Sequence, residues 1–84
     1  MTQDEIRETV VRLLAKIAPE IDPASVKHDV ELRDQFDLDS MDWLTYIIAI
    51  DETLDVGIPE ADYQQLITVD AFVEYLGARL GVPA

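Results

Sequence analysis

The group best placed for chemistry in this chain is a serine between two carboxylates, in the run Asp39-Ser40-Met41-Asp42. An Asp at position 39 can accept hydrogen bonds from the free backbone N–H groups of a first helical turn, and Asp42 adds negative charge where the helix dipole favours it. The run therefore predicts a helix that begins at Ser40 and exposes the serine hydroxyl. Ser and Asp also cap many helices without a chemical function, so this run alone does not assign one.

A catalytic serine needs a base, and the chain offers one histidine, His28, in the segment before the serine. No Gly-x-Ser-x-Gly turn surrounds Ser40, so the motif of a serine hydrolase is absent. The sequence contains no cysteine. Any thiol chemistry must therefore come from an attached group, and we expect that the protein itself is not an enzyme.

The carboxylates do not form a recognisable metal site. Asp37 and Asp39 begin a D-x-D pattern of the EF-hand type, but Met41 falls at the next ligand position, the required glycine is missing, and Ile48 replaces the bidentate glutamate. We therefore predict no metal site.

The charge is strongly acidic and unevenly distributed. Eighteen acidic and six basic residues give a formal net charge of −12, which disfavours nucleic acids and anionic membrane surfaces. From residue 34 to residue 78 the chain has no Lys or Arg and eleven acids: Asp34, Asp37, Asp39, Asp42, Asp51, Glu52, Asp55, Glu60, Asp62, Asp70 and Glu74. This half is suited to partners with basic surfaces, although part of it serves solubility.

The length and periodicity predict one all-α domain over residues 1–84, a small four-helix bundle. Three longer helices are expected: one from a Thr2 capping box to about Ala18, one from Ser40 to about Leu54, and one that follows Thr68 and closes at Gly81. A short helix is expected from Pro59 to Leu66, and Gly57 suits a helix end or a turn. The long loop 19–38 should be pinned by Ile21, Val26, Val30, Leu32 and Phe36, with one helical turn at Asp22-Pro23.

The helix from Ser40 has two apolar stripes. One stripe should face the core, and it consists of Trp43, Tyr46, Ile47, Ile50 and Leu54. Met41, Leu44 and Ile48 lie on another side, bordered by Asp37, Asp42, Asp51, Glu52 and Asp55. Because these carboxylates are costly to bury, we interpret the second stripe as an exposed partner site and not as further core. Charge reversal at Asp39, Asp42 or Asp51 should then weaken partner binding more than folding.

In order and spacing, these features resemble the acyl carrier protein family over nearly the whole chain. The matching segments are Asp39-Ser40-Met41-Asp42, Asp51-Glu52, Ile58-Pro59-Glu60 and Thr68-Val69. The resemblance implies that Ser40, next to Asp39, carries a 4'-phosphopantetheine arm derived from coenzyme A and presents acyl groups as thioesters. It also implies a surface that partner enzymes recognise, made of Met41, Asp42, Leu44, Ile48, Asp51, Glu52 and Glu60.

The chain departs from fatty-acid carriers at four other positions. Thr45 and Gln64 stand where acids are common, and Trp43 and Tyr63 stand where residues around the acyl pocket are generally small. We therefore expect a short or polar cargo, and an aminoacyl or peptidyl carrier is an alternative to an acyl carrier. An acidic helical adaptor without a prosthetic group is the alternative from a different class.

The expected partners are a phosphopantetheinyl transferase and acyl- or aminoacyl-loading and acyl-transferring enzymes with basic docking surfaces. No apolar run approaches the ~20 residues of a membrane span, so no membrane is expected among the partners. We expect a monomer in a reducing cytoplasm.

Overall fold

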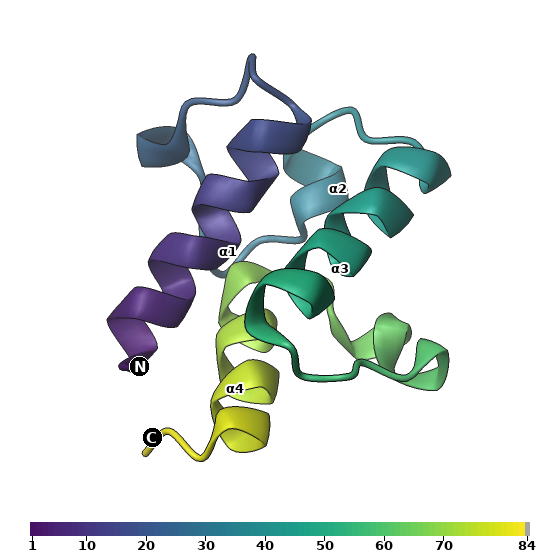
Figure 1. Cartoon of the computed structure of the whole chain (residues 1–84). Coiled ribbons are helices and arrows are strands. Elements are labelled where there is room, and N and C mark those ends of the chain that lie inside the picture. Colours follow the sequence, from purple (N-terminus) through teal and green to yellow (C-terminus); the bar gives the residue numbers. More distant parts are fainter. Residues whose placement is uncertain (84) are drawn as a thin grey trace.

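The computed structural model describes residues 1–83, and regular structure in this part is entirely helical (Figure 1). Three long helices, α1 (Gln3–Ile17), α3 (Ser40–Leu54) and α4 (Val69–Leu80), form the body of the molecule. Three short elements lie between them: η1 (Pro23–Ser25), α2 (Leu32–Gln35) and η2 (Glu60–Gln65). The predicted fold class, a small all-α bundle with three longer helices, is confirmed. No helix in residues 1–83 has the length and apolar character needed to cross a membrane.

The helix starts lie where their capping residues predict them. At α1, the backbone N–H of Glu5 donates to Thr2 Oγ1 (3.2 Å) and the backbone N–H of Thr2 donates to Glu5 Oε1 (2.9 Å). This reciprocal pair is the predicted capping box, and its hydrogen bonds lower the pKa of Glu5. At α4, the backbone N–H of Ala71 donates to Thr68 Oγ1 (3.0 Å).

α3 ends at Leu54, as predicted, and Gly57 lies in the turn after it. Asp55 follows the last helical residue and adopts the left-handed conformation, with φ of 52°. Asp is one of the few types other than Gly that tolerate this region, which explains why the helix can end at this position without a glycine. Gly57 has φ of 67° in the turn that follows. The expected short helix begins at Glu60, with Pro59 as its N-cap, and is a 3₁₀-helix.

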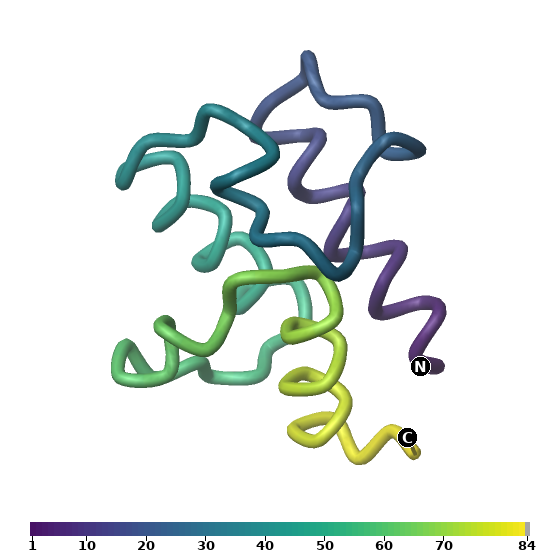
Figure 2. The backbone as a smooth tube through the Cα atoms, turned by 180° about the vertical axis from the view of Figure 1, so that it is seen from behind, coloured from purple at the N-terminus to yellow at the C-terminus, as the bar shows by residue number. Residues whose placement is uncertain are grey.

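The loop between α1 and α3 is more ordered than predicted (Figure 2). The expected turn at Asp22-Pro23 is present as η1, but the turn α2 was not anticipated. Leu32 in α2 is completely buried, and its backbone N–H donates to the carbonyl of Ile67 (2.9 Å). Val30, predicted to be an anchor, is 36% exposed, and its carbonyl accepts a hydrogen bond from the Gln35 side chain (2.8 Å). The loop is thus fixed here by polar contacts.

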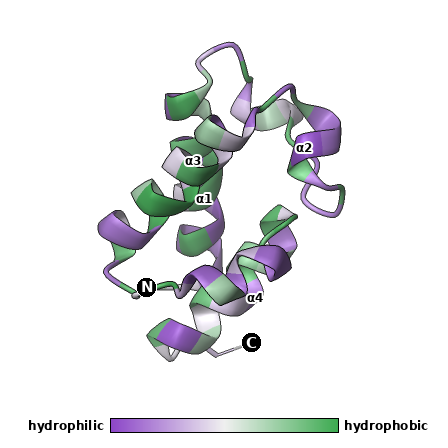
Figure 3. Ribbon diagram, turned by 90° about the vertical axis from the view of Figure 1, so that its right-hand side faces the viewer, coloured by the Kyte–Doolittle hydropathy of each residue, from purple (hydrophilic) through white to green (hydrophobic). Residues whose placement is uncertain are grey.

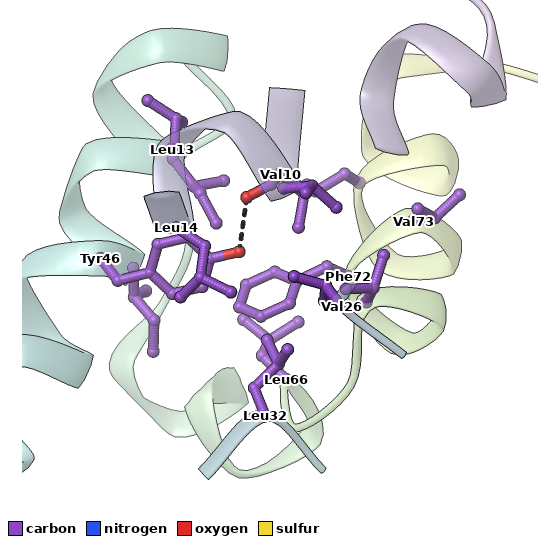
Figure 4. Close-up of a cluster of buried hydrophobic side chains, with 14 of the residues drawn as sticks. Val10, Leu13, Leu14, Val26, Leu32, Tyr46, Leu66, Phe72 and Val73 are labelled. Atoms are coloured by element: carbon purple, nitrogen blue, oxygen red, sulfur yellow. Dashed lines mark hydrogen bonds between the residues drawn. The ribbon is translucent and has the colours of Figure 1, made fainter. Parts of the chain in front are cut away.

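The core lies between the three long helices and is closed by α2 and the η2–α4 connection (Figure 4). Its completely buried side chains are Ile6, Val10, Leu14, Leu32, Tyr46, Ile47, Ile50, Leu66, Val69, Phe72 and Leu76. In Figure 3, hydrophobic residues (green) cover much of α1 and α3, whereas α2 is largely hydrophilic (purple). On the predicted core stripe of α3, Tyr46, Ile47 and Ile50 are buried, and Trp43 and Leu54 are half-buried against the core.

The hydroxyl group of Tyr46 lies in this core and has a hydrogen-bond partner there. The Tyr46 hydroxyl donates to the carbonyl oxygen of Val10 (2.8 Å), which ties α3 to α1. Burial raises the pKa of Tyr46 far above its ordinary value, so the hydroxyl keeps the proton that it donates. The Tyr46 ring also lies against Phe72, with ring centroids 5.4 Å apart, so one side chain links all three long helices.

Candidate functional site

The serine hydroxyl stands free at the start of α3. Ser40 is the first residue of the helix and is exposed. The Asp39 carboxylate accepts the backbone N–H of Asp42 at 2.8 Å, and the backbone N–H of Trp43 donates to the carbonyl of Asp39 at 3.0 Å. The predicted N-cap and helix start are therefore confirmed. No side-chain hydrogen bond found within residues 1–83 involves Ser40, so the hydroxyl is sterically and chemically able to accept a covalent substituent.

A strip of apolar side chains leads away from this serine along α3. Met41 is 71% exposed, Ile48 42% and Leu44 40%, whereas their neighbour Ile47 is completely buried. We call Met41, Leu44 and Ile48 the apolar strip. The prediction that this second stripe is exposed is confirmed, and large apolar side chains exposed together are typical of an interaction surface.

Carboxylates surround the apolar strip, and most of them point into solvent. The exposed acids near it on the chain are Asp37, Asp39, Asp42, Glu52 and Asp55, and Glu60 is exposed at the start of η2. Within residues 1–83, the two ion pairs found are Arg7–Asp4 and Arg79–Asp62, so these acids keep their charge unpaired. Their field favours a partner with a basic surface.

Asp51 differs from the other acids of this set. It is half-buried, and the backbone N–H groups of Gly57 and Ile58 donate to its two carboxylate oxygens at 2.9 and 3.2 Å. Asp51 therefore holds the turn that follows α3. We therefore expect charge reversal at Asp51 to weaken folding as well as partner binding, because a Lys or Arg cannot accept these hydrogen bonds.

A groove of about 320 Å³ opens beside the first turns of α3. Trp43 from α3 and Tyr63 from η2 line it, together with Glu31, Arg33, Gln64 and Ile67. Trp43 is fixed by the Tyr46 and Phe72 rings, with centroids 5.7 and 6.2 Å away. The two aromatic residues thus border an open groove. From their size we expected instead that their rings fill the space that an acyl chain would need. The contribution of Glu31, Arg33 and Ile67 has no signal in the sequence, because it depends on the α2 turn and on the backbone bond from Leu32 to Ile67.

The described part of the chain has neither a Ser–His pair at Ser40 nor a cluster of side chains arranged to bind a metal ion. His28 is half-buried, and its backbone carbonyl accepts the N–H of Asp70 at the start of α4 (3.0 Å). No hydrogen bond joins it to Ser40 within residues 1–83, so the structure provides no Ser–His pair. The same residues contain no group of three or more His, Cys, Asp or Glu side chains arranged to hold a metal ion.

Comparison with known proteins connects this geometry to a family. Residues 4–76 match the family model described as "Phosphopantetheine attachment site". The chain belongs to the acyl carrier protein family. It is 31% identical to an acyl carrier protein of Campylobacter jejuni over 75 residues, 89% of this chain and 91% of the relative. It is 29% identical to that of Campylobacter curvus over 73 residues, 87% and 88% of the two chains.

A mitochondrial acyl carrier protein from Neurospora crassa is 28% identical over 76 residues. The match covers 90% of this chain and 57% of that longer relative. Acyl carrier proteins are carriers and not catalysts, and their prosthetic group is 4'-phosphopantetheine. An acyl carrier protein interacts with the enzymes that modify it and that handle its acyl groups. The arm supplies the thiol that this cysteine-free chain lacks, and holds the acyl group as a thioester.

Proposed function

We propose that Ser40 is the residue to which phosphopantetheine is attached in this acyl carrier protein. The chain has two serines, and their surroundings differ. The hydroxyl of Ser25 donates to the carbonyl of Asp22 (2.8 Å), whereas the Ser40 hydroxyl is exposed without such a bond in the described residues. This free hydroxyl at a helix start is the observation that carries the proposal.

The residues around Ser40 act by positioning. Asp39 fixes the first turn of α3 through its bond to Asp42, so the serine is presented on a rigid element and not on a loop. The backbone N–H groups of that turn and the helix dipole favour a phosphate beside them. A cargo held near an enzyme's active site reacts at a high effective concentration, and this is how a carrier contributes to a reaction without catalysing it.

We propose that the apolar strip and its exposed acids form the surface that partner enzymes bind. The residues assigned to it are Met41, Asp42, Leu44, Ile48, Glu52 and Glu60, with Asp51 supporting the surface from within. The partners would be a phosphopantetheinyl transferase and acyl- or aminoacyl-loading enzymes with basic docking surfaces. The acids provide long-range attraction, and the apolar side chains provide area that loses water on contact. The protein would act as a monomer, and its buried hydrophobic residues form one core cluster within the described part of the chain.

The groove between Trp43 and Tyr63 supports a short or polar cargo. Trp43 lies three residues from Ser40, about 4.5 Å along the helix axis, so the groove is within reach of an arm attached there. Its volume of about 320 Å³ is at the lower end for small-molecule sites. An aminoacyl group is the second candidate, because Glu31 and the aromatic rings at the groove attract an ammonium group, against the opposing charge of Arg33.

Mass spectrometry of the intact protein tests the attachment site. We expect a phosphopantetheinyl transferase and coenzyme A to add one phosphopantetheine to the parent chain and to Ser25→Ala, and none to Ser40→Ala. Circular dichroism should show the same helix content in all three proteins. Modification of Ser40→Ala would assign another residue, and no modification of the parent by several transferases would favour the adaptor without a prosthetic group.

A further inference from the structure

Three side chains fasten η2 to α4. The Tyr75 hydroxyl donates to Asp62 Oδ2 at 2.6 Å, and the Arg79 guanidinium donates to the same oxygen at 3.1 Å. The Arg79 guanidinium carbon also lies 4.8 Å from the centre of the Tyr75 ring. We call Asp62, Tyr75 and Arg79 the η2 clasp.

The hydroxyl bond is the stronger part of the η2 clasp. It is short and charge-assisted, whereas the Arg79 side chain is 40% exposed and solvent weakens its ion pair. Partial burial and the bond to Asp62 raise the pKa of Tyr75 above its ordinary value. The tyrosine therefore keeps the proton that forms this bond throughout the neutral pH range.

Besides the η2 clasp, the middle of η2 is held by Tyr63, which is half-buried and packs against the core. None of its residues, Glu60–Gln65, is buried, although Ile58 before it and Leu66 after it are. Within residues 1–83, the side-chain hydrogen bonds between η2 and another element are the two on Asp62. Elements with few buried contacts open at low free-energy cost, so the position of η2 depends on the η2 clasp.

The same short helix is one wall of the groove beside Ser40. Tyr63 and Gln64, which directly follow Asp62, line the groove opposite Trp43. The Trp43 wall is held by two aromatic neighbours from the core. One wall is thus fixed in the core, and the other wall is held by the half-buried Tyr63 and by the three side chains of the η2 clasp.

We propose that the η2 clasp limits the length of the acyl group that the groove accepts, by holding η2 close to α3. Asp62, Tyr75 and Arg79 are then positioning residues for cargo specificity. This inference rests on the proposed loading of Ser40. With the clasp intact, the groove admits a short acyl group, and a longer chain stays in solvent; release of η2 widens the groove for the longer chain.

The variant Tyr75→Phe removes the bonding hydroxyl and keeps the ring. Tyr46→Phe is its matched control, because it also loses one hydroxyl hydrogen bond, but the bond joins α3 to α1 and not η2 to α4. Arg79→Gln removes the weaker contact and should have a smaller effect of the same kind.

The first measurement is hydrogen exchange of the full-length, unloaded chain followed by NMR. The reporters are the Asp62 and Leu66 amides, which donate within the η2 region to Pro59 (2.9 Å) and Tyr63 (3.1 Å). We expect them to exchange about tenfold faster in Tyr75→Phe than in Tyr46→Phe, measured relative to core amides of α1 in each variant. If the ratio of the reporter exchange rates to the core exchange rates is equal in the two variants, the clasp does not hold η2.

The second measurement compares butyryl and octanoyl groups loaded on the arm, with loading verified by mass. In the parent and in Tyr46→Phe, the NMR signals of Trp43 and Ile67 should shift with butyryl and return toward the unloaded positions with octanoyl. In Tyr75→Phe, octanoyl should shift them as well. Octanoyl shifts of the same size in all three proteins would overturn the length limit. Failure to load would instead reject the proposed function, while hydrogen exchange still tests the clasp.

Discussion

Asp51 and Glu52 are adjacent acids with the same charge and different surroundings. Both carboxylate oxygens of Asp51 accept hydrogen bonds from backbone N–H groups after the end of α3, whereas Glu52 is exposed. The sequence places both in one acidic surface, because charge and spacing carry no information about which carboxylate bends back to the chain. The distinction requires the turn at Gly57 and Ile58, which no local pattern specifies.

The substitutions Asp51→Asn and Glu52→Gln test this difference. Each removes one negative charge, so both should slow association with a basic partner by a similar factor. Asp51→Asn should also lower the free energy of unfolding by about 1–2 kcal/mol, because an amide cannot replace both charged acceptor oxygens. Glu52→Gln should change it by less than ~0.5 kcal/mol. Urea denaturation measures the difference, and equal stabilities would mean that the Asp51 bonds contribute nothing.

Among the elements, α3 has a buried face and an exposed apolar face that the sequence separates correctly. The 3.6-residue period distinguishes Ile47 from Ile48, and the structure finds the first completely buried and the second 42% exposed. The three capped helix starts were likewise predictable, because a side-chain cap is a local interaction.

Short and non-local features were not predictable in the same way. The turn α2 has four residues, too few for a hydrophobic period, and depends on the backbone bond from Leu32 to Ile67. The groove beside Ser40 combines residues from α2, α3, η2 and the residue Ile67. The sequence identified its aromatic members, Trp43 and Tyr63, from their positions in a family pattern, but the remaining members depend on how the elements pack.

The two faces of α3 should separate stability from recognition. Ile47→Ala should lower the free energy of unfolding by about 2–4 kcal/mol, because it leaves a cavity in the core. Ile48→Ala should cost less than about 1 kcal/mol, yet lower kcat/KM for phosphopantetheine transfer to the chain about tenfold, a loss of ~1.4 kcal/mol of partner contact. Thermal unfolding and transferase kinetics measure the pair. A transfer rate unchanged by Ile48→Ala would remove the apolar strip from the docking surface.

Across the whole molecule, charge acts on folding and on binding in opposite directions. A net charge of −12 on 84 residues makes the folded chain repel itself, while the same field attracts basic partners. Salt screens both interactions at distances beyond about 10 Å at 0.1 M.

Sodium chloride should therefore stabilise the unloaded protein and weaken its partner binding at once. We expect a higher Tm in 0.5 M than in 0.01 M salt. Each increase of 1 kcal/mol in the free energy of unfolding should raise Tm by ~4–8 °C. The association rate constant with a basic transferase should fall over the same range. Differential scanning calorimetry and stopped-flow mixing measure the two effects. An effect of calcium chloride well beyond that of sodium chloride at equal ionic strength would indicate a specific cation site instead of screening.

The stacking of Trp43 against Tyr46 and Phe72 also gives the protein a built-in optical probe. Trp43 is the sole tryptophan, it is half-buried, and it forms one wall of the groove beside Ser40. Selective excitation of the indole therefore monitors one defined location without a dye or an added label. Because the emission of an indole responds to the polarity around its ring, any molecule that enters or leaves the groove would be followed in real time in the native chain.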